Sequence, residues 1–125
     1  MELGGKNLIV NGDRILVAPE KGESLNKAGL YLPATAVDAK QVHSGRVVEI
    51  GPGHLLAQMD KNSESWKNET DEPKYVPLQA KVGDIALYLK EQAIEIAFEG
   101  KNFVIVPNSS LLALVRHSLV QSLEG

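Results

Sequence analysis

Histidine is the residue type that could most readily do chemistry here, and the sequence has three, His43, His54 and His117. Each stands alone among uncharged or small neighbours, and no two have the spacing that brings imidazoles to one metal ion. There is no cysteine to complete a metal site or to act as a thiol nucleophile. We therefore expect three solvated surface histidines, no metal site and no cofactor.

The carboxylates are the other candidates for chemistry, and they fall into two groups. Glu69, Asp71 and Glu72 lie in a polar stretch, whereas Glu95 and Glu99 alternate outward along an expected strand. Solvated faces explain both groups without general acid–base catalysis. With no convergent catalytic set, the sequence predicts no catalytic residue and a protein that is not an enzyme.

One glycine-rich motif could suggest a phosphate-binding loop. Gly51-Pro52-Gly53 lacks the lysine of a phosphate-binding loop, and its proline has no amide hydrogen to donate. The motif is instead typical of a turn that ends a strand.

Composition limits the classes of function. The chain of 125 residues fits one domain, residues 1–125, and its 13 basic against 16 acidic residues give no electrostatic footprint for nucleic acid. The longest uncharged stretch, residues 102–115, is interrupted by Pro107, so we expect no membrane span. The lack of cysteine fits a reducing compartment, and we expect a cytoplasmic protein.

The elements that must position any site are expected to be strands. Short apolar runs bounded by turn signals, one of them with period-two alternation, predict strands over residues 13–18, 45–50, 84–89, 94–98, 103–106 and 111–115. Residues 99–102 predict a hairpin between two of them. Short strands with turns between them indicate an all-β barrel or sandwich.

Two long segments, residues 20–40 and 54–80, do not resemble strands. Both are mostly polar and exceed the usual connection length, so function is expected there. The first holds one apolar island, Leu30-Tyr31-Leu32, beside Pro33. After Val115 two interpretations fit the sequence about equally well. One is a short amphipathic helix, and the other is a strand that ends near Arg116 and is followed by a frayed tail.

Five motifs in order make the chain resemble a known family. They are GDRILVAPE, K-AGLYLPATA, SGRVVEIGPG, AKVGDIALY and FEGKNFVIVPNSSLLALV. In this order and spacing they resemble the GroES-like chaperonin-10 co-chaperonins. The resemblance implies a small irregular GroES-like β-barrel that assembles into a heptameric ring. It also implies that the ring caps a GroEL-type chaperonin and encloses client proteins, while the partner binds ATP.

The resemblance also assigns roles to segments of this chain. Residues 20–40 correspond to a mobile loop in which Gly29, Leu30, Tyr31 and Leu32 would bind the chaperonin. Residues 54–80 correspond to a roof hairpin, longer than in the short bacterial form, and residues 117–125 to a tail. Bulky Tyr31 departs from the modest aliphatic residues common in that loop.

The ring interface follows from the same resemblance. The first strand of one subunit would pair with the last strand of its neighbour, and both segments are apolar enough to need cover. This implies a subunit interface formed by Leu8, Ile9 and Val10 with Leu111, Leu112 and Leu114.

Other interpretations remain open from the residues alone. Leu30-Tyr31-Leu32 could be a short strand packed on the chain's own core rather than a docking segment. The whole protein could be a stand-alone GroES-like barrel that serves as an interaction or scaffold module without capping a chaperonin.

Overall fold

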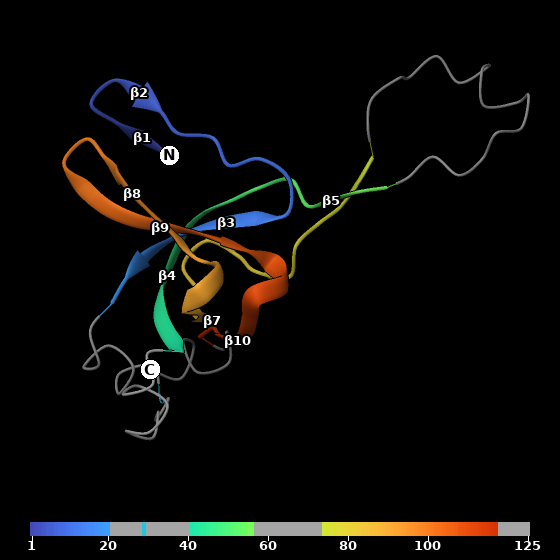
Figure 1. Ribbon diagram of the computed structural model, residues 1–125. Helices are drawn as coiled ribbons and strands as arrows, with labels where there is room; N and C mark the ends of the chain where they lie inside the picture. Colours follow the sequence, from blue (N-terminus) through green and yellow to red (C-terminus); the bar gives the residue numbers. More distant parts are fainter. Residues whose placement is uncertain (21–28, 30–40, 57–73, 118–125) are drawn as a thin grey trace, which may run out of the picture.

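The computed structural model describes residues 1–20, 29, 41–56 and 74–117, and its regular structure is almost entirely β-strand (Figure 1). Within these ranges there is no α-helix, and the helical turns η2 (Lys90–Gln92) and η3 (Asn108–Ser110) are short 3-10 turns. The predicted all-β fold class is confirmed.

The main element is an antiparallel sheet of six strands in the order β10-β7-β4-β3-β9-β8. The strands are β3 (Arg14–Pro19), β4 (Val42–Ile50), β7 (Ile85–Leu89), β8 (Ile94–Phe98), β9 (Lys101–Pro107) and β10 (Leu111–Val115). All six predicted strands are present, with ends shifted by up to three residues. Among the described residues β10 and β8 do not pair with each other, so the hydrogen-bond ladder is that of an open sheet.

The predicted hairpin joins β8 to β9 through a two-residue turn. Glu99 and Gly100 both have positive φ, 50° and 76°. A two-residue turn with positive φ at both residues has a backbone twist that matches the right-handed twist of the two antiparallel strands it joins. Lys101 and Asn102, expected in the turn, instead begin β9.

Strand β3 is buried on both faces and divides the core in two. Ile15 and Val17 point into one apolar cluster with Val47 and Tyr88, whereas Leu16 points into a second. This follows from the two-residue period of a strand. A central strand of apolar residues therefore serves both faces of the sheet.

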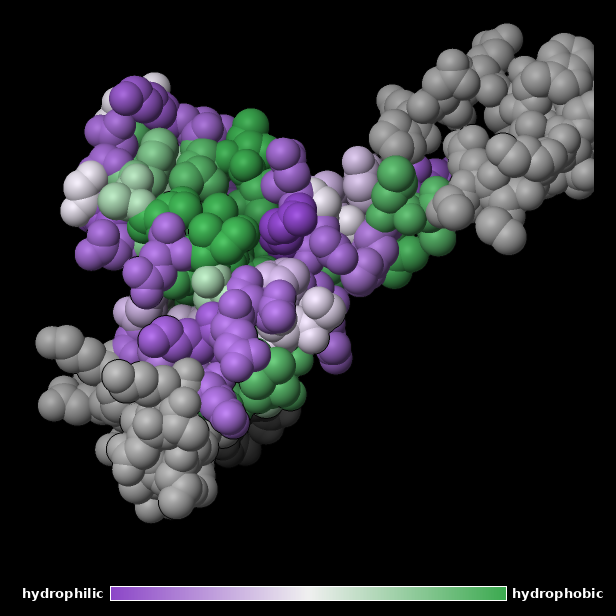
Figure 2. Space-filling view, viewed as in Figure 1, coloured by the Kyte–Doolittle hydropathy of each residue, from purple (hydrophilic) through white to green (hydrophobic). Residues whose placement is uncertain are grey.

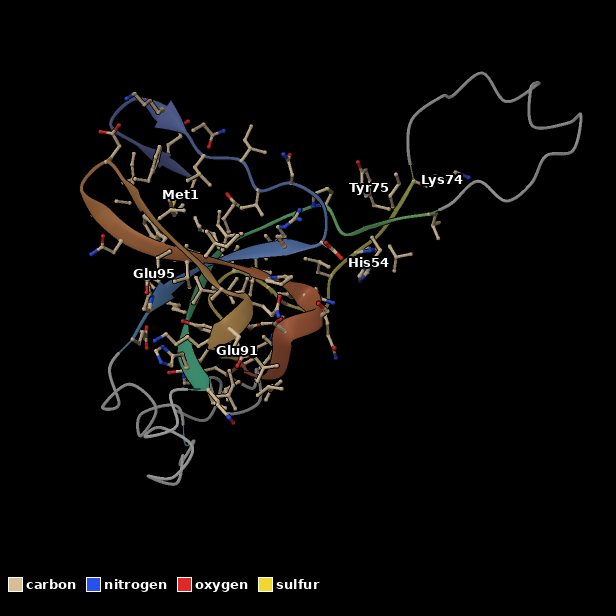
Figure 3. All side chains as sticks on the ribbon, in the orientation of Figure 1. Met1, His54, Lys74, Tyr75, Glu91 and Glu95 are labelled. Atoms are coloured by element: carbon tan, nitrogen blue, oxygen red, sulfur yellow. The ribbon has the colours of Figure 1, made fainter. Side chains whose placement is uncertain are left out.

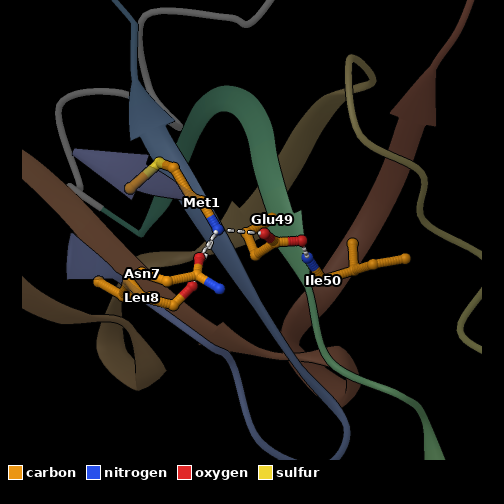
Figure 4. A network of polar contacts seen from close by, with 5 residues as sticks. All are labelled: Met1, Asn7, Leu8, Glu49 and Ile50. Carbon is orange, nitrogen blue, oxygen red and sulfur yellow. Dashed lines mark hydrogen bonds and ion pairs between the residues drawn. The ribbon is translucent and has the colours of Figure 1, made fainter. Parts of the chain in front are cut away.

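The second face is covered by an N-terminal hairpin that the sequence analysis did not predict. Strands β1 (Glu2–Leu3) and β2 (Lys6–Asn7) pair with each other, and Met1, Leu3 and Leu8 pack against the second cluster. The N-terminal ammonium of Met1 donates to Glu49 Oε2 at 2.7 Å and to Leu8 O at 3.0 Å (Figure 4). This ammonium holds the pKa of Glu49 below its ordinary value.

A two-stranded ribbon leaves the sheet after β4 (Figure 1). It consists of β5 (His54–Leu55) and β6 (Tyr75–Val76). The expectation that residues 54–80 form no strand is therefore wrong at the two ends of the segment, while residues 57–73 lie outside the described residues. The predicted turn at Gly51-Pro52-Gly53 is where β4 ends and the ribbon begins.

Candidate functional site

The proposed chaperonin-binding residues lie mostly outside the described part of the chain. Gly29 is exposed, with φ at +82°, and Leu30, Tyr31 and Leu32 are not described. The residues at either end of this segment are held by backbone hydrogen bonds. Glu20 N donates to Ser44 O at 3.1 Å, and Lys90 N donates to Gln41 O at 2.9 Å. Glu20 and Gln41, the described residues on either side of 21–40, are therefore both fixed close to β4.

Strand β10 carries the second half of the expected interface, and it lies at the edge of the sheet. Among the described residues it pairs only with β7. Leu111 and Leu114 pack against the main core, whereas Leu112 is 52% exposed. The pairing register shifts by one residue between Leu111 and Ala113. A bulge of this kind changes the direction of side chains along a strand.

A hollow lies beside β10. It has a volume of about 370 Å³ and is lined by Gln79, Asn108 and residues 111–114. The edge strand therefore offers both an unpaired backbone and an indentation that a side chain of another molecule could fill.

Residues 8–10, the first half of the expected interface, do not form an edge strand as β10 does. Residues 8–10 are in no strand, and the chain does not bring them against its own β10. Val10 is buried in the second cluster, and Leu8 packs partly against it with its N–H and C=O both bonded to Met1. Ile9 is 73% exposed. Of the six nominated residues, Ile9 and Leu112 are the ones with large exposed apolar side chains.

Asp84 is a functional candidate that the sequence analysis missed. Its carboxylate is buried and accepts hydrogen bonds from Arg116 Nε at 2.7 Å, Arg116 Nη2 at 2.6 Å and Lys81 N at 2.8 Å. Arg116 Nη2 also donates to Gln79 O at 3.1 Å. The hydrogen bonds from Arg116 hold the pKa of Asp84 below its usual value despite burial. The pair joins the residue before β7 to the residue after β10.

All three histidines are described, and His43 alone is less solvated than expected, whereas His54 and His117 are exposed. His43 is half-buried on β4 beside Tyr88, and burial lowers the pKa of its imidazole. Because the side chain of His43 lies partly inside the fold, the prediction of a solvated histidine there is wrong. His54 is half exposed, with its Nδ1 3.4 Å from Asp13 Oδ2 and its Nε2 3.5 Å from Asn108 Nδ2. These contacts join the base of the ribbon to the sheet.

The ribbon exposes an apolar surface. Leu55, Leu56, Tyr75 and Val76 are all among the large exposed hydrophobic residues. Figure 2 shows this apolar surface on the ribbon, away from the main body, and Figure 3 shows Tyr75 and His54 there. Exposed apolar groups gathered on one small element are typical of an interaction surface.

Residues 1–20, 29, 41–56 and 74–117 contain no cluster of three or more histidine, aspartate or glutamate side chains placed to hold a metal ion. The same residues include no helix long and apolar enough to cross a membrane.

Comparisons with known proteins agree with this geometry. The family model described as "Chaperonin 10 Kd subunit" matches residues 7–72. A protein named co-chaperonin GroES from Coprothermobacter proteolyticus is 32% identical over 85% of this chain and 92% of its own length. A protein of the same name from Bifidobacterium animalis subsp. lactis is 34% identical over 82% of this chain and 89% of its own length. Another, from an Exiguobacterium species, is 32% identical over 83% of this chain and 94% of its own length.

The extent of these matches decides the family. The family model spans more than half of the chain, and each relative aligns over most of both sequences. The all-β sheet is consistent with the fold that the sequence motifs implied. This chain is a member of the chaperonin 10 family of co-chaperonins.

Proposed function

We propose that this protein is a cytoplasmic co-chaperonin that forms a ring-shaped lid on a GroEL-type chaperonin. Residues 1–125 form one GroES-like domain, and seven copies form the ring. The chaperonin binds ATP, and the lid closes a chamber in which a client protein folds. The lid itself binds no cofactor and catalyses no reaction. Membership of the chaperonin 10 family is the observation that carries this proposal.

Assembly is proposed to use two exposed apolar side chains on opposite parts of the fold. Ile9 of one copy contacts the edge of β10 on the next, where Leu112 is exposed beside the hollow. A contact between two different surfaces of identical subunits is heterologous, and it gives a closed ring when the rotation closes. The unpaired backbone of β10 supplies hydrogen bonds to the incoming segment.

Docking to the chaperonin is proposed to use Gly29, Leu30, Tyr31 and Leu32 in the mobile loop, residues 20–40. The polar residues around this apolar island cannot bury it internally, which leaves it available to a partner. A segment that becomes ordered on binding gives a weak single contact. Several such segments on one ring bind tightly through effective concentration while each contact stays reversible.

The docking assignment is tested by placing a charge in the apolar island. Leu30→Asp and Leu32→Asp should each leave the ring at seven times the chain mass of 13.5 kDa and abolish co-purification with a GroEL-type chaperonin in the presence of ATP. Lys27→Gln, in the polar stretch before the island, is the control and should still bind. Chaperonin binding by both aspartate variants would contradict the assignment.

The roof segment, residues 54–80, is proposed to close the top of the dome, and residues 117–125 to form a tail.

A protein that runs as a monomer or dimer on sizing would favour a stand-alone interaction module over a lid. The exposed surfaces of Ile9 and Leu112 support the ring.

A further inference from the structure

Strand β10 could pair with β7 either without interruption or with a one-residue shift in register. The structure shows the shifted pairing. Leu111 lies opposite Tyr88, but Ala113 lies opposite Leu87, so the register shifts by one residue. From Ala113 onward the pairing is regular and ends with Val115 opposite Ile85. The next pair in this register is Arg116 with Asp84, the two residues joined by the bidentate ion pair.

The regular register would separate that pair. If the pairing continued from Leu111 opposite Tyr88 without a shift, Val115 would lie opposite Asp84. The buried carboxylate of Asp84 would then lose its cation, and an unpaired buried charge is strongly destabilising. In the observed register the carboxylate keeps both bonds from Arg116.

The choice of register decides which side chains β10 presents at its open edge. With the shift, Leu111 and Leu114 pack on the core, while Leu112 and Ala113 are exposed. Strict alternation from Leu111 would place Leu114 on the side away from the core. A one-residue change in register would therefore remodel the edge and the hollow beside it.

We propose that the Asp84–Arg116 pair fixes the register of β10 and thereby sets the surface that this edge offers to a second copy of the chain. Arg116 is a positioning residue: its side chain acts through β10. The link to a second copy rests on the proposed ring, whereas control of the register within one chain does not.

The chain offers a direct test because it contains no cysteine. A disulfide forms between residues directly opposite each other, so a cysteine pair reports the register. The double substitution Ile85→Cys with Val115→Cys reports the observed register, and Ile85→Cys with Leu114→Cys reports the regular one, because Leu114 lies opposite Ala86 on the core side in the observed register. The yield of each intramolecular disulfide after mild oxidation is measured by mass spectrometry.

With Arg116 present, the 85–115 disulfide should form in preference to the 85–114 disulfide. Arg116→Gln should lower this preference about tenfold or more, since hydrogen bonds to charged groups are among the stronger ones. Arg116→Lys, which keeps the charge but not the planar fork, should give an intermediate ratio. Lys6→Gln removes a surface ion pair to Glu99 and should leave the ratio unchanged.

A second measurement separates this proposal from the proposed function. Without added cysteines, Arg116→Gln should raise the protein concentration at which the ring dissociates. An unchanged disulfide ratio in Arg116→Gln would overturn register control, even if the ring forms normally. A changed ratio in a protein that forms no ring would support register control and count against the ring.

Discussion

Asp84 is the residue whose role in the fold is least visible in the sequence. Its partner Arg116 lies 32 positions away, and nothing in a single sequence links the two. Asp84 sits in the KVGD motif, which the sequence analysis used as a family signal and not as an ion pair. The structure explains the carboxylate: it is buried where the turn before β7, β7 itself and the end of β10 meet. Long-range pairs of this kind appear only once the sheet order is known.

The lowered pKa of Asp84 predicts how stability depends on pH. Because its folded-state pKa lies below the ordinary value of 3.8, the unfolded chain takes up the proton first as pH falls. The stability that Asp84 contributes is therefore present above pH 3.8 and is lost as pH falls through the folded-state pKa. Glu49, whose pKa is also lowered, acts in the same direction.

Asp84→Asn should lower the free energy of unfolding at pH 7 by about 2 kcal/mol. The difference from wild type should shrink as pH falls from 3.8 towards the folded-state pKa, because the carboxylate of the unfolded wild-type chain is protonated first and that of the folded chain only at the lower pKa. Urea unfolding at a series of pH values and one fixed protein concentration measures this. Exposed Glu91→Gln is the control. A constant difference at every pH would show that charge is not the cause.

At the scale of elements, long apolar strands were predictable and short ones were not. β3 and β7 follow from short apolar runs between turn signals, and β8 follows from period-two alternation. The hairpin β1–β2 was missed because its strands are two residues long and only Leu3 is apolar. The Gly4-Gly5 turn, with φ at 60° and 77°, was the signal that could have found it. Periodicity missed the ribbon strands β5 and β6 because a long polar stretch lies between them, although the family resemblance implied a hairpin in this segment.

The turn between β4 and the ribbon gives a prediction for a single glycine. Gly53 has φ at +119°, and a Cβ there would overlap the carbonyl oxygen of Val76. Gly53→Ala should therefore cost more than the roughly 1 kcal/mol expected from backbone strain alone and should release the ribbon from the sheet.

Gly83→Ala is the matched control for that substitution. Gly83 also has positive φ, +99°, but a Cβ there meets nothing within 4 Å. Thermal unfolding of both variants separates steric overlap from backbone strain. Equal losses in Tm for the two variants would show that the overlap with Val76 does not matter.

At the scale of the whole molecule, the sequence motifs were enough to identify the family but not to separate the interface residues from the core. All six nominated residues are apolar, and apolar residues serve cores and interfaces alike. The structure shows which of them are exposed: Val10 is buried and Leu8 is bonded to Met1, whereas Ile9 and Leu112 are exposed and carry the proposed interface. Burial, which depends on tertiary packing, was the missing information.

That separation predicts the effect of two charged substitutions. Ile9→Asp and Leu112→Asp should each prevent ring assembly, because a charge would be buried between subunits, while the fold of one chain stays intact. Analytical ultracentrifugation with circular dichroism checks both points. Val76→Asp, on the apolar surface of the ribbon, is the comparison and should leave the ring formed by Ile9 and Leu112 in place. Rings formed by the Ile9→Asp and Leu112→Asp variants would exclude these two residues from the interface.

The most direct test of a chaperonin lid is the refolding of a client protein. A denatured client that does not refold spontaneously is mixed with a GroEL-type chaperonin and ATP, with or without this protein, and recovery of its native activity is followed. The proposed function predicts recovery with the wild-type protein and none with Leu32→Asp or Ile9→Asp. No gain over chaperonin and ATP alone, or equal recovery with the wild type and both variants, would contradict it.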